Sequence, residues 1–135
     1  MSPSEYNQRI IEEFRANDGY VEGRGRTVLL LHTIGAKSGK ERVTPVAHIR
    51  DGDKYVIIAS KGGAPDNPDW FHNIVANPVV TVEVGTKKFD AKAAIQSEPE
   101  RTGLYNKMAE AMPGFAEYRK KTSRVIPVIV LTPIQ

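Results

Sequence analysis

Short apolar runs, each the length of a strand and separated by turn-forming residues, limit most strongly what this chain can fold into. We predict six strands, at residues 27–34, 43–50, 54–60, 79–85, 87–95 and 125–134. Asp51-Gly52-Asp53 and Gly85-Thr86 are typical hairpin turns, so the strands flanking each turn should be antiparallel. Pro45 cannot donate a ladder hydrogen bond, which places its strand at a sheet edge, at a bulge or where backbone is left unpaired.

Helical patterns surround these strands, beginning at the N-terminus. Tyr6, Ile10 and Phe14 recur at four-residue spacing, which predicts an amphipathic helix with one apolar stripe. The preceding residues match a capping box with Ser2 as N-cap and Pro3 at the first helical position. We expect this helix to pack on the chain's own barrel, and contact with a membrane surface or a partner is the alternative.

Two further helices, and then a loop with a short helix, are predicted later in the chain. One spans residues 69–77, with Asn67 as N-cap and Pro68 in its first turn. The other begins in residues 97–100 (SEPE), and a loop and short helix follow at residues 112–122. The inward-facing residues of the later helix should be Leu104, Tyr105 and Met108.

Strands joined mostly by hairpins, with helices at the ends and one inserted in the middle, do not match a series of βαβ units. They favour a mainly β (α+β) fold, an antiparallel barrel or strongly curled sheet with peripheral helices. The 135 residues are the length of one domain, and 40% of them are hydrophobic. We therefore expect a single domain over residues 1–135, in which residues 1–20 form the N-terminal helix and a linker.

Composition narrows the function classes. The absence of Cys excludes disulfides and thiolate chemistry and suits a reducing compartment. Charges lie where a signal peptide would be apolar, and the apolar runs are too short to span a membrane. The expected location is the cytoplasm, with membrane association through the N-terminal helix as the open alternative.

Several familiar catalytic motifs are missing. The three histidines are far apart and no HExxH occurs, so no metal site is expected. We expect His32 and His48 to be barrel histidines with local hydrogen bonds and His72 to lie on a helix surface. No G-x-S-x-G is present, and GAKSGK at residues 35–40 has three residues between its glycines where a P-loop needs four.

The stretch TIGAKSGKERVTPV, residues 33–46, concentrates positive charge on a glycine-bearing loop. Lys37, Lys40 and Arg42 lie within six positions, opposed by Glu41. Charged donors beside accessible backbone amides suit an anion, especially a phosphate. A solvated hairpin tip is the alternative for such a cluster taken alone.

A second polar segment should lie near this loop. Ser60 and Lys61 precede two glycines at the end of a predicted strand, and the helix that follows begins near Trp70. A helix N-terminus favours anions, and Trp70 can serve either as a core anchor or as a platform for a planar ring. No nucleophile, metal site or carboxylate pair is evident, which favours a flavin-like cofactor that performs the reaction itself.

At these residues the sequence resembles the deazaflavin-dependent nitroreductase family, actinobacterial oxidoreductases that use coenzyme F420. The resemblance covers roughly residues 24–135 and is close in LLLHTIGAKSGKERVTPVAHI, VIIASKGGAPDNPDWFHNIVANP and IPVIVLTP. It implies a split β-barrel of the flavin-reductase and pyridoxamine-phosphate-oxidase type.

The resemblance also implies a reaction. Reduced F420 would pass a hydride to a planar apolar acceptor such as a quinone, whereas nitroaromatic reduction is less expected. FMN is the alternative cofactor, and a carrier that binds F420 without turnover is the alternative function. We expect a monomer or weak homo-oligomer and no nucleic-acid binding, because the aromatic residues lie at core-like spacings.

Residue by residue, the resemblance implies the following sites. The cofactor contacts are Ala36, Lys37, Ser38, Lys40, Arg42, Val43, Thr44, Pro45, Val46, Ala47, Ile58, Ala59, Ser60, Lys61, Gly62, Gly63, Asp69, Trp70, Phe71, His72 and Asn73. Of these, Lys37, Ser38 and Arg42 would hold the phosphate and the start of the glutamyl tail, and residues 44–47 would line the ring. Ser60 either orients the acceptor or only binds cofactor. Met112, Phe115 and Tyr118 would shape the acceptor pocket, where relatives carry several tyrosines.

Overall fold

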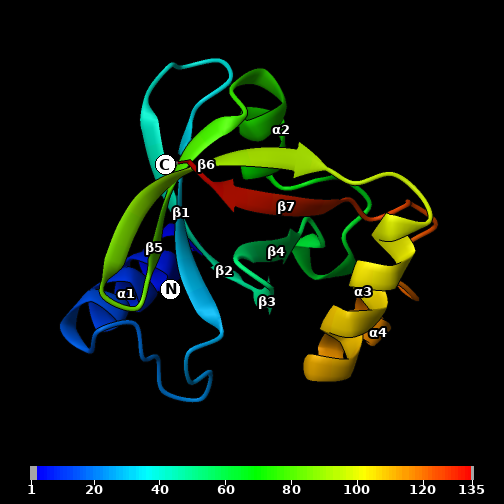
Figure 1. The fold of residues 1–135 in the computed structure, drawn as a ribbon, viewed down its shortest axis with the longest axis horizontal. Helices are drawn as coiled ribbons and strands as arrows, with labels where there is room; N and C mark the ends of the chain where they lie inside the picture. The colour runs from blue at the N-terminus through cyan, green and yellow to red at the C-terminus, as the bar shows by residue number, and fades with distance from the viewer. Residues whose placement is uncertain (1–2, 135) are drawn as a thin grey trace.

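A computed structural model describes residues 3–134 of the chain (Figure 1). Its strands are β1 (Val28–Ile34), β2 (Glu41–Ala47), β3 (Ile49–Asp51), β4 (Lys54–Ile58), β5 (Val79–Val84), β6 (Lys87–Ile95) and β7 (Val128–Pro133). The helices are α1 (Pro3–Ala16), α2 (Asp69–Ala76), α3 (Glu100–Ala111) and α4 (Gly114–Tyr118), with a short 3₁₀ turn η1 (Lys61–Gly63). Helix α1 and the α3–α4 pair lie at opposite ends of the molecule (Figure 1).

The seven strands form one antiparallel sheet in the order β2-β1-β5-β6-β7-β4-β3. The two edge strands, β2 and β3, are consecutive in the chain, and only His48 separates them. Because one residue cannot bridge the width of a flat sheet, the sheet curls until its edges approach each other. This confirms the predicted antiparallel curled sheet with peripheral helices.

The strand predicted at residues 43–50 is instead two strands, so the prediction of six strands is wrong. Residues 41–47 pair with β1, from Val28 opposite Ala47 to Ile34 opposite Glu41, and residues 49–51 pair with β4. At the break, the His48 N–H donates to the Thr27 carbonyl oxygen at 2.8 Å and the side chain is buried. Pro45 lies in edge strand β2, which is one of the three positions that its missing N–H allows.

Strand β1 is buried on both faces, which explains its unbroken apolar run. Leu29 and Leu31 belong to the core inside the curled sheet, whereas Val28 and Leu30 pack against α1. A third apolar cluster lies between the sheet and α3–α4. Of the inward-facing residues predicted for α3, Tyr105 and Met108 are buried in it and Leu104 is partly buried against it.

Helix α1 packs on the sheet, as predicted. Ile10, Ile11 and Phe14 are buried there, so its apolar face is already used. Tyr6 does not join this stripe: it is 45% exposed, and its hydroxyl accepts a hydrogen bond from Arg24 Nη2 at 2.6 Å. The helix begins at Pro3, and the predicted cap Ser2 lies outside the described residues.

The predicted cap of α2 is wrong. Pro68 occupies the N-cap position and makes no side-chain cap, while Asn67 Oδ1 accepts a hydrogen bond from Arg124 Nη1 at 2.5 Å. Strand β7 begins at Val128 rather than at 125, after an exposed Val125.

The three histidines differ in their surroundings. His32 is buried and bonded, and His72 is exposed on α2, both as predicted. His48 is buried in the barrel as predicted, but its Nδ1 has no hydrogen-bond partner among residues 3–134. Burial, in turn, lowers the pKa of His48.

A charged chain of contacts joins α1 to the sheet. Arg15 donates to both carboxylate oxygens of Glu83, at 3.3 Å from Nε and 2.7 Å from Nη2. His32 Nε2 lies 2.6 Å from the same carboxylate. The hydrogen bond from Arg15, followed by that from His32, holds the pKa of Glu83 below its ordinary value despite burial.

Glu83→Gln should therefore remove an acid-sensitive part of the stability. Because the folded pKa of Glu83 is depressed, its contribution is present above the ordinary glutamate value near 4.5 and is lost as pH falls through the folded value. We expect the variant to be less stable at pH 7 by about 1–3 kcal/mol, with the difference shrinking in acid. Urea unfolding between pH 7 and pH 3 measures this.

Glu110→Gln is the matched control, since Glu110 is exposed on α3 and makes no ion pair within residues 3–134. A constant stability gap between wild type and Glu83→Gln across the pH range would contradict the prediction.

Candidate functional site

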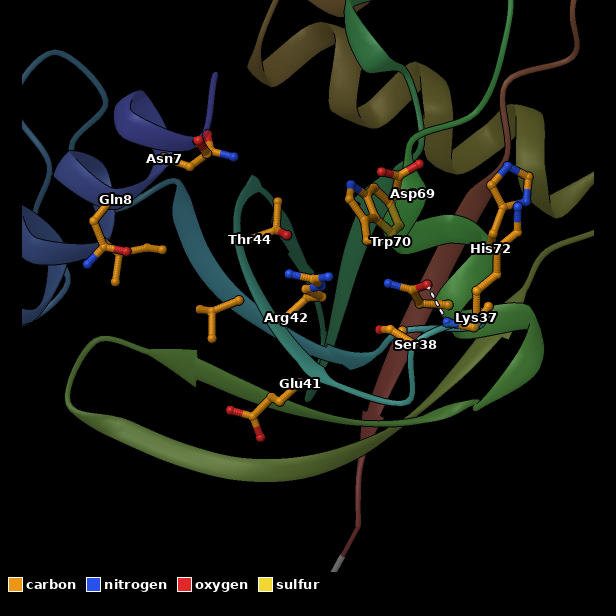
Figure 2. A pocket seen from close by; sticks show the side chains of 16 residues that line it. Asn7, Gln8, Lys37, Ser38, Glu41, Arg42, Thr44, Asp69, Trp70 and His72 are labelled. Atoms are coloured by element: carbon orange, nitrogen blue, oxygen red, sulfur yellow. Dashed lines mark hydrogen bonds between the residues drawn. The ribbon is translucent and has the colours of Figure 1, made fainter. Parts of the chain in front are cut away.

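A cavity of about 990 Å³ opens between α1, β2, the loop after β1 and the start of α2 (Figure 2). Its lining residues are Ser4, Asn7, Gln8, Ile11, Gly35, Ala36, Lys37, Ser38, Glu41, Arg42, Val43, Thr44, Asp69, Trp70, His72 and Asn73. Figure 2 shows Asn7 and Gln8 on one side, Asp69 and Trp70 on the other, and Arg42 and Thr44 between them. The cavity is large enough for a cofactor.

The loop at residues 35–40 is a compact turn that joins β1 to β2. Gly35 N donates to the Lys40 carbonyl oxygen at 2.8 Å, and Gly39 N donates to the Gly35 carbonyl oxygen at 2.9 Å. Gly39 has a φ of +70°, and a Cβ on Gly35 would clash with Ser38 Oγ. The two glycines therefore permit a turn that brings Lys37 and Ser38 to the cavity wall.

Two positive side chains of this turn and strand are free to bind an anion. Lys37 and Arg42 line the cavity, are exposed, and make no ion pair within the described part of the chain. The neighbouring carboxylate, Glu41, contacts His32 Nδ1 at 3.2 Å instead. Lys37 and Arg42 therefore give their part of the wall positive charge, while the carboxylates of Glu41 and Asp69 line other parts of the cavity.

The structure brings together ten of the residues expected to bind cofactor. They are Ala36, Lys37, Ser38, Arg42, Val43, Thr44, Asp69, Trp70, His72 and Asn73. The other eleven do not line this cavity: Lys40, Pro45, Val46, Ala47, Ile58, Ala59, Ser60, Lys61, Gly62, Gly63 and Phe71. Lys61 pairs with Asp66 at 3.3 Å, so its charge is partly compensated on the surface.

The segment from Ala59 to Asn67 is fixed by a residue that the sequence reasoning missed. The Arg124 guanidinium donates to the carbonyl oxygens of Ala59 at 3.1 Å, Ser60 at 2.9 Å and Ala64 at 2.9 Å, as well as to Asn67 Oδ1. Ser60 is 7% exposed, and its Oγ makes no hydrogen bond to residues 3–134. Arg124 thus fixes the backbone that carries this free hydroxyl.

The three residues expected to shape an acceptor pocket lie by α3 and α4, not in the cavity. Phe115 is buried, and its carbonyl oxygen accepts a hydrogen bond from the Tyr105 hydroxyl at 2.6 Å. Met112 and Tyr118 are half-buried in the same apolar cluster, which also includes Ala47 of β2. Strand β2 therefore runs from the cavity, at Thr44, to this cluster, at Ala47.

The sequence reasoning also missed the wall contributed by α1. Ser4, Asn7, Gln8 and Ile11 line the cavity, and their spacing places them on one helix face. The pattern was visible in the sequence, but the apolar stripe of the helix does not reveal that its polar neighbours face a cavity.

Known proteins show the same combination of fold and motifs. A family model described as F420H2-dependent quinone reductase matches residues 7–133. An F420H2-dependent quinone reductase of Mycobacterium tuberculosis is 46% identical over 107 residues, covering 77% of this chain and 72% of that protein.

Solved structures agree with this. An F420H2-dependent reductase, FDR-A, superposes with a TM-score of 0.73 at 42% identity, covering 78% of this chain and 94% of that one. A domain-swapped dimer superposes with a TM-score of 0.74 at 38% identity, covering 96% of this chain and 99% of that one. A Listeria innocua protein named for pyridoxamine 5′-phosphate oxidase superposes with a TM-score of 0.58 at 11% identity, covering 95% of this chain and 93% of that one. At this identity the likeness shows the fold alone.

Between residues 3 and 134, no helix has both the length and the apolar character needed to cross a membrane. The match over nearly the whole chain, together with the relatives and the fold, confirms the resemblance found in the sequence. The chain belongs to the F420H2-dependent quinone reductase family.

Proposed function

We propose that this protein binds reduced F420 in the cavity beside α1 and reduces a planar, apolar quinone. The observation that carries the proposal is the pair of unpaired cations, Lys37 and Arg42, on a cavity wall of a chain that belongs to this family. F420 carries a phosphate and a glutamyl tail, which are the anionic groups that such a wall favours. When bound, the reduced cofactor supplies a hydride.

The donor groups of the cavity fit this cofactor. Lys37 and Arg42 supply charge-assisted hydrogen bonds for the anionic part, and Ser38 adds a hydroxyl. Trp70 is anchored in the core, where it is 7% exposed, and also borders the cavity. Thr44 lies in the stretch of β2 along which we place the flat ring system. FMN, with one phosphate, would use fewer of these cations.

On the acceptor side we assign an orienting role to Ser60. Its hydroxyl is unengaged and its backbone is held by Arg124, so it can hydrogen-bond a carbonyl oxygen of a bound quinone. The half-buried Met112 and Tyr118 offer apolar surface, since both pack against the apolar cluster that Ala47 of β2 also borders. Holding the acceptor close to the cofactor and excluding water would supply most of the rate.

We also propose that residues 1–135 act as one domain and that the protein is a monomer or weak homo-oligomer. The domain proposal rests on the single sheet that runs through the described chain. A dimeric relative makes the oligomeric state worth measuring by sedimentation.

Arg42→Gln should weaken F420 binding, because it removes one cation from the cavity wall. We expect the dissociation constant to rise about tenfold, and the salt dependence of binding to fall, since a charged contact is lost. Fluorescence titration of F420 at two salt concentrations measures both, and a parallel titration with FMN tests the cofactor preference.

Lys40→Gln is the matched control. Lys40 lies in the same loop with the same charge but does not line the cavity, so its removal should change the affinity less than about threefold. Equal effects of the two substitutions would contradict the cavity assignment, and tighter binding of FMN would contradict the cofactor.

Ser60→Ala should slow the reduction of menadione by reduced F420. Losing one hydrogen bond to the acceptor should lower kcat/KM about tenfold while the dissociation constant of F420 stays unchanged. Recovery of the absorbance of oxidised F420 follows the reaction, with Ser97→Ala, an exposed site before α3, as control.

A change confined to F420 affinity would assign Ser60 to cofactor binding alone. Stoichiometric binding without turnover in the wild type would identify a carrier rather than an enzyme.

A further inference from the structure

One buried side chain joins the loop at residues 35–40 to the rest of the protein. Asn73, on α2, is 7% exposed although it borders the cavity. Its Oδ1 accepts a hydrogen bond from Ala36 N at 2.9 Å, drawn as the dashed line in Figure 2. Its Nδ2 donates to Thr33 Oγ1 at 3.1 Å, and Thr33 is 1% exposed at the end of β1. Both ends of the amide are therefore engaged within the protein.

The hydrogen bond to Ala36 N lies at the start of a helical turn in this loop. The hydrogen bond from Gly39 N to the Gly35 carbonyl oxygen closes one helical turn over residues 36–38. The first N–H groups of such a turn have no partner within it. Asn73 satisfies the first of them, as an N-cap would, but from another helix.

The next two amides remain open. The backbone N–H groups of Lys37 and Ser38 make no hydrogen bond to any of residues 3–134, and both residues line the cavity. Successive amides in a turn of this kind form a concave site for an anion. The side chains of Lys37 and Arg42 add positive charge to the same wall.

We propose that Asn73 is a positioning residue: it holds the turn at residues 36–38 so that the amides of Lys37 and Ser38 stay open to the anionic part of the ligand. The identity of that ligand rests on the proposed function. Asn73 acts through the turn and not by touching the cofactor, which differs from the contact that the resemblance implies for it.

Substitutions of Asn73 can distinguish a residue that holds the turn from one that touches the cofactor. Asn73→Ala leaves the Ala36 N–H and the Thr33 hydroxyl without their partner, so the turn loses its tether. Asn73→Asp keeps an acceptor for Ala36, and the Thr33 hydroxyl can rotate to donate to the carboxylate. Asn73→Asp therefore holds the turn but adds negative charge beside the anion site.

Thr33→Val is the matched control. It removes the partner of Nδ2 and leaves the bond between Asn73 and Ala36 in place. It is also buried, so any general loss of stability from disturbing this region should appear in it too.

The test measures hydrogen exchange at the Ala36 amide in the ligand-free protein, together with F420 affinity. In Asn73→Ala we expect exchange at Ala36 to quicken about tenfold or more, and the dissociation constant of F420 to rise about tenfold. The salt dependence of binding should match the wild type, because no charge has been removed. Asn73→Asp should keep the Ala36 amide protected from exchange but weaken F420 binding. Thr33→Val should change the exchange rate at Ala36 and the dissociation constant of F420 by less than about threefold.

Weaker F420 binding in Asn73→Ala with unchanged exchange at Ala36 would show a direct ligand contact and overturn the proposal, as would unchanged values of both. Should Asn73→Ala fail to fold, Asn73→Ser replaces it, since its short hydroxyl cannot span both partners. Failure of the wild type to bind F420 would refute the proposed function, while the exchange measurement would still decide whether Asn73 holds the turn.

Discussion

The two edges of the sheet are joined by one residue, His48, and the rest of the architecture follows from that link. A sheet whose edge strands are consecutive in the chain has to curl, and the curl encloses the core built on Leu29 and Leu31. The same curl leaves β2 at an edge, where Pro45 is tolerated. The loop that enters β2 is thereby placed at the rim, within reach of both α1 and α2.

The charged residues beside the cavity differ in whether they have ion-pair partners. Glu41 precedes Arg42 in the strand, and because successive side chains of a strand point to opposite faces, its carboxylate contacts His32 rather than Arg42. His32 in turn contacts Glu83, which Arg15 of α1 holds through two hydrogen bonds. The network that fastens α1 to the sheet thus also engages Glu41, and Arg42 makes no ion pair in the described chain.

Features set by local chemistry were predictable from the sequence, and features set by distant contacts were not. The hairpin turns, the edge position of Pro45 and the stripe formed by Ile10 and Phe14 depend on neighbouring residues alone. The break at His48 depends on a hydrogen bond to Thr27. The bonds from Arg124 to residues 59–67 cross about 60 positions, and a single Arg before the last strand carries no local signal of them. The motifs therefore pointed to the residues of the proposed site without showing which distant contacts hold the segment at 59–67.

The expected cofactor residues fall into two regions, and β2 explains why both belong to one proposed site. Thr44 lines the cavity with the cations, whereas Ala47 borders the same apolar cluster as Met112 and Tyr118. The backbone of Tyr118 lies beside Gly63, within the segment that Arg124 fixes. Thr44 and Ala47 lie about 10 Å apart along the strand and point to opposite faces of it, so a ligand that reached both would have to follow the open edge of β2. An elongated molecule with an anionic tail and a flat head fits this separation, because the tail needs the charged turn and the head needs an apolar surface.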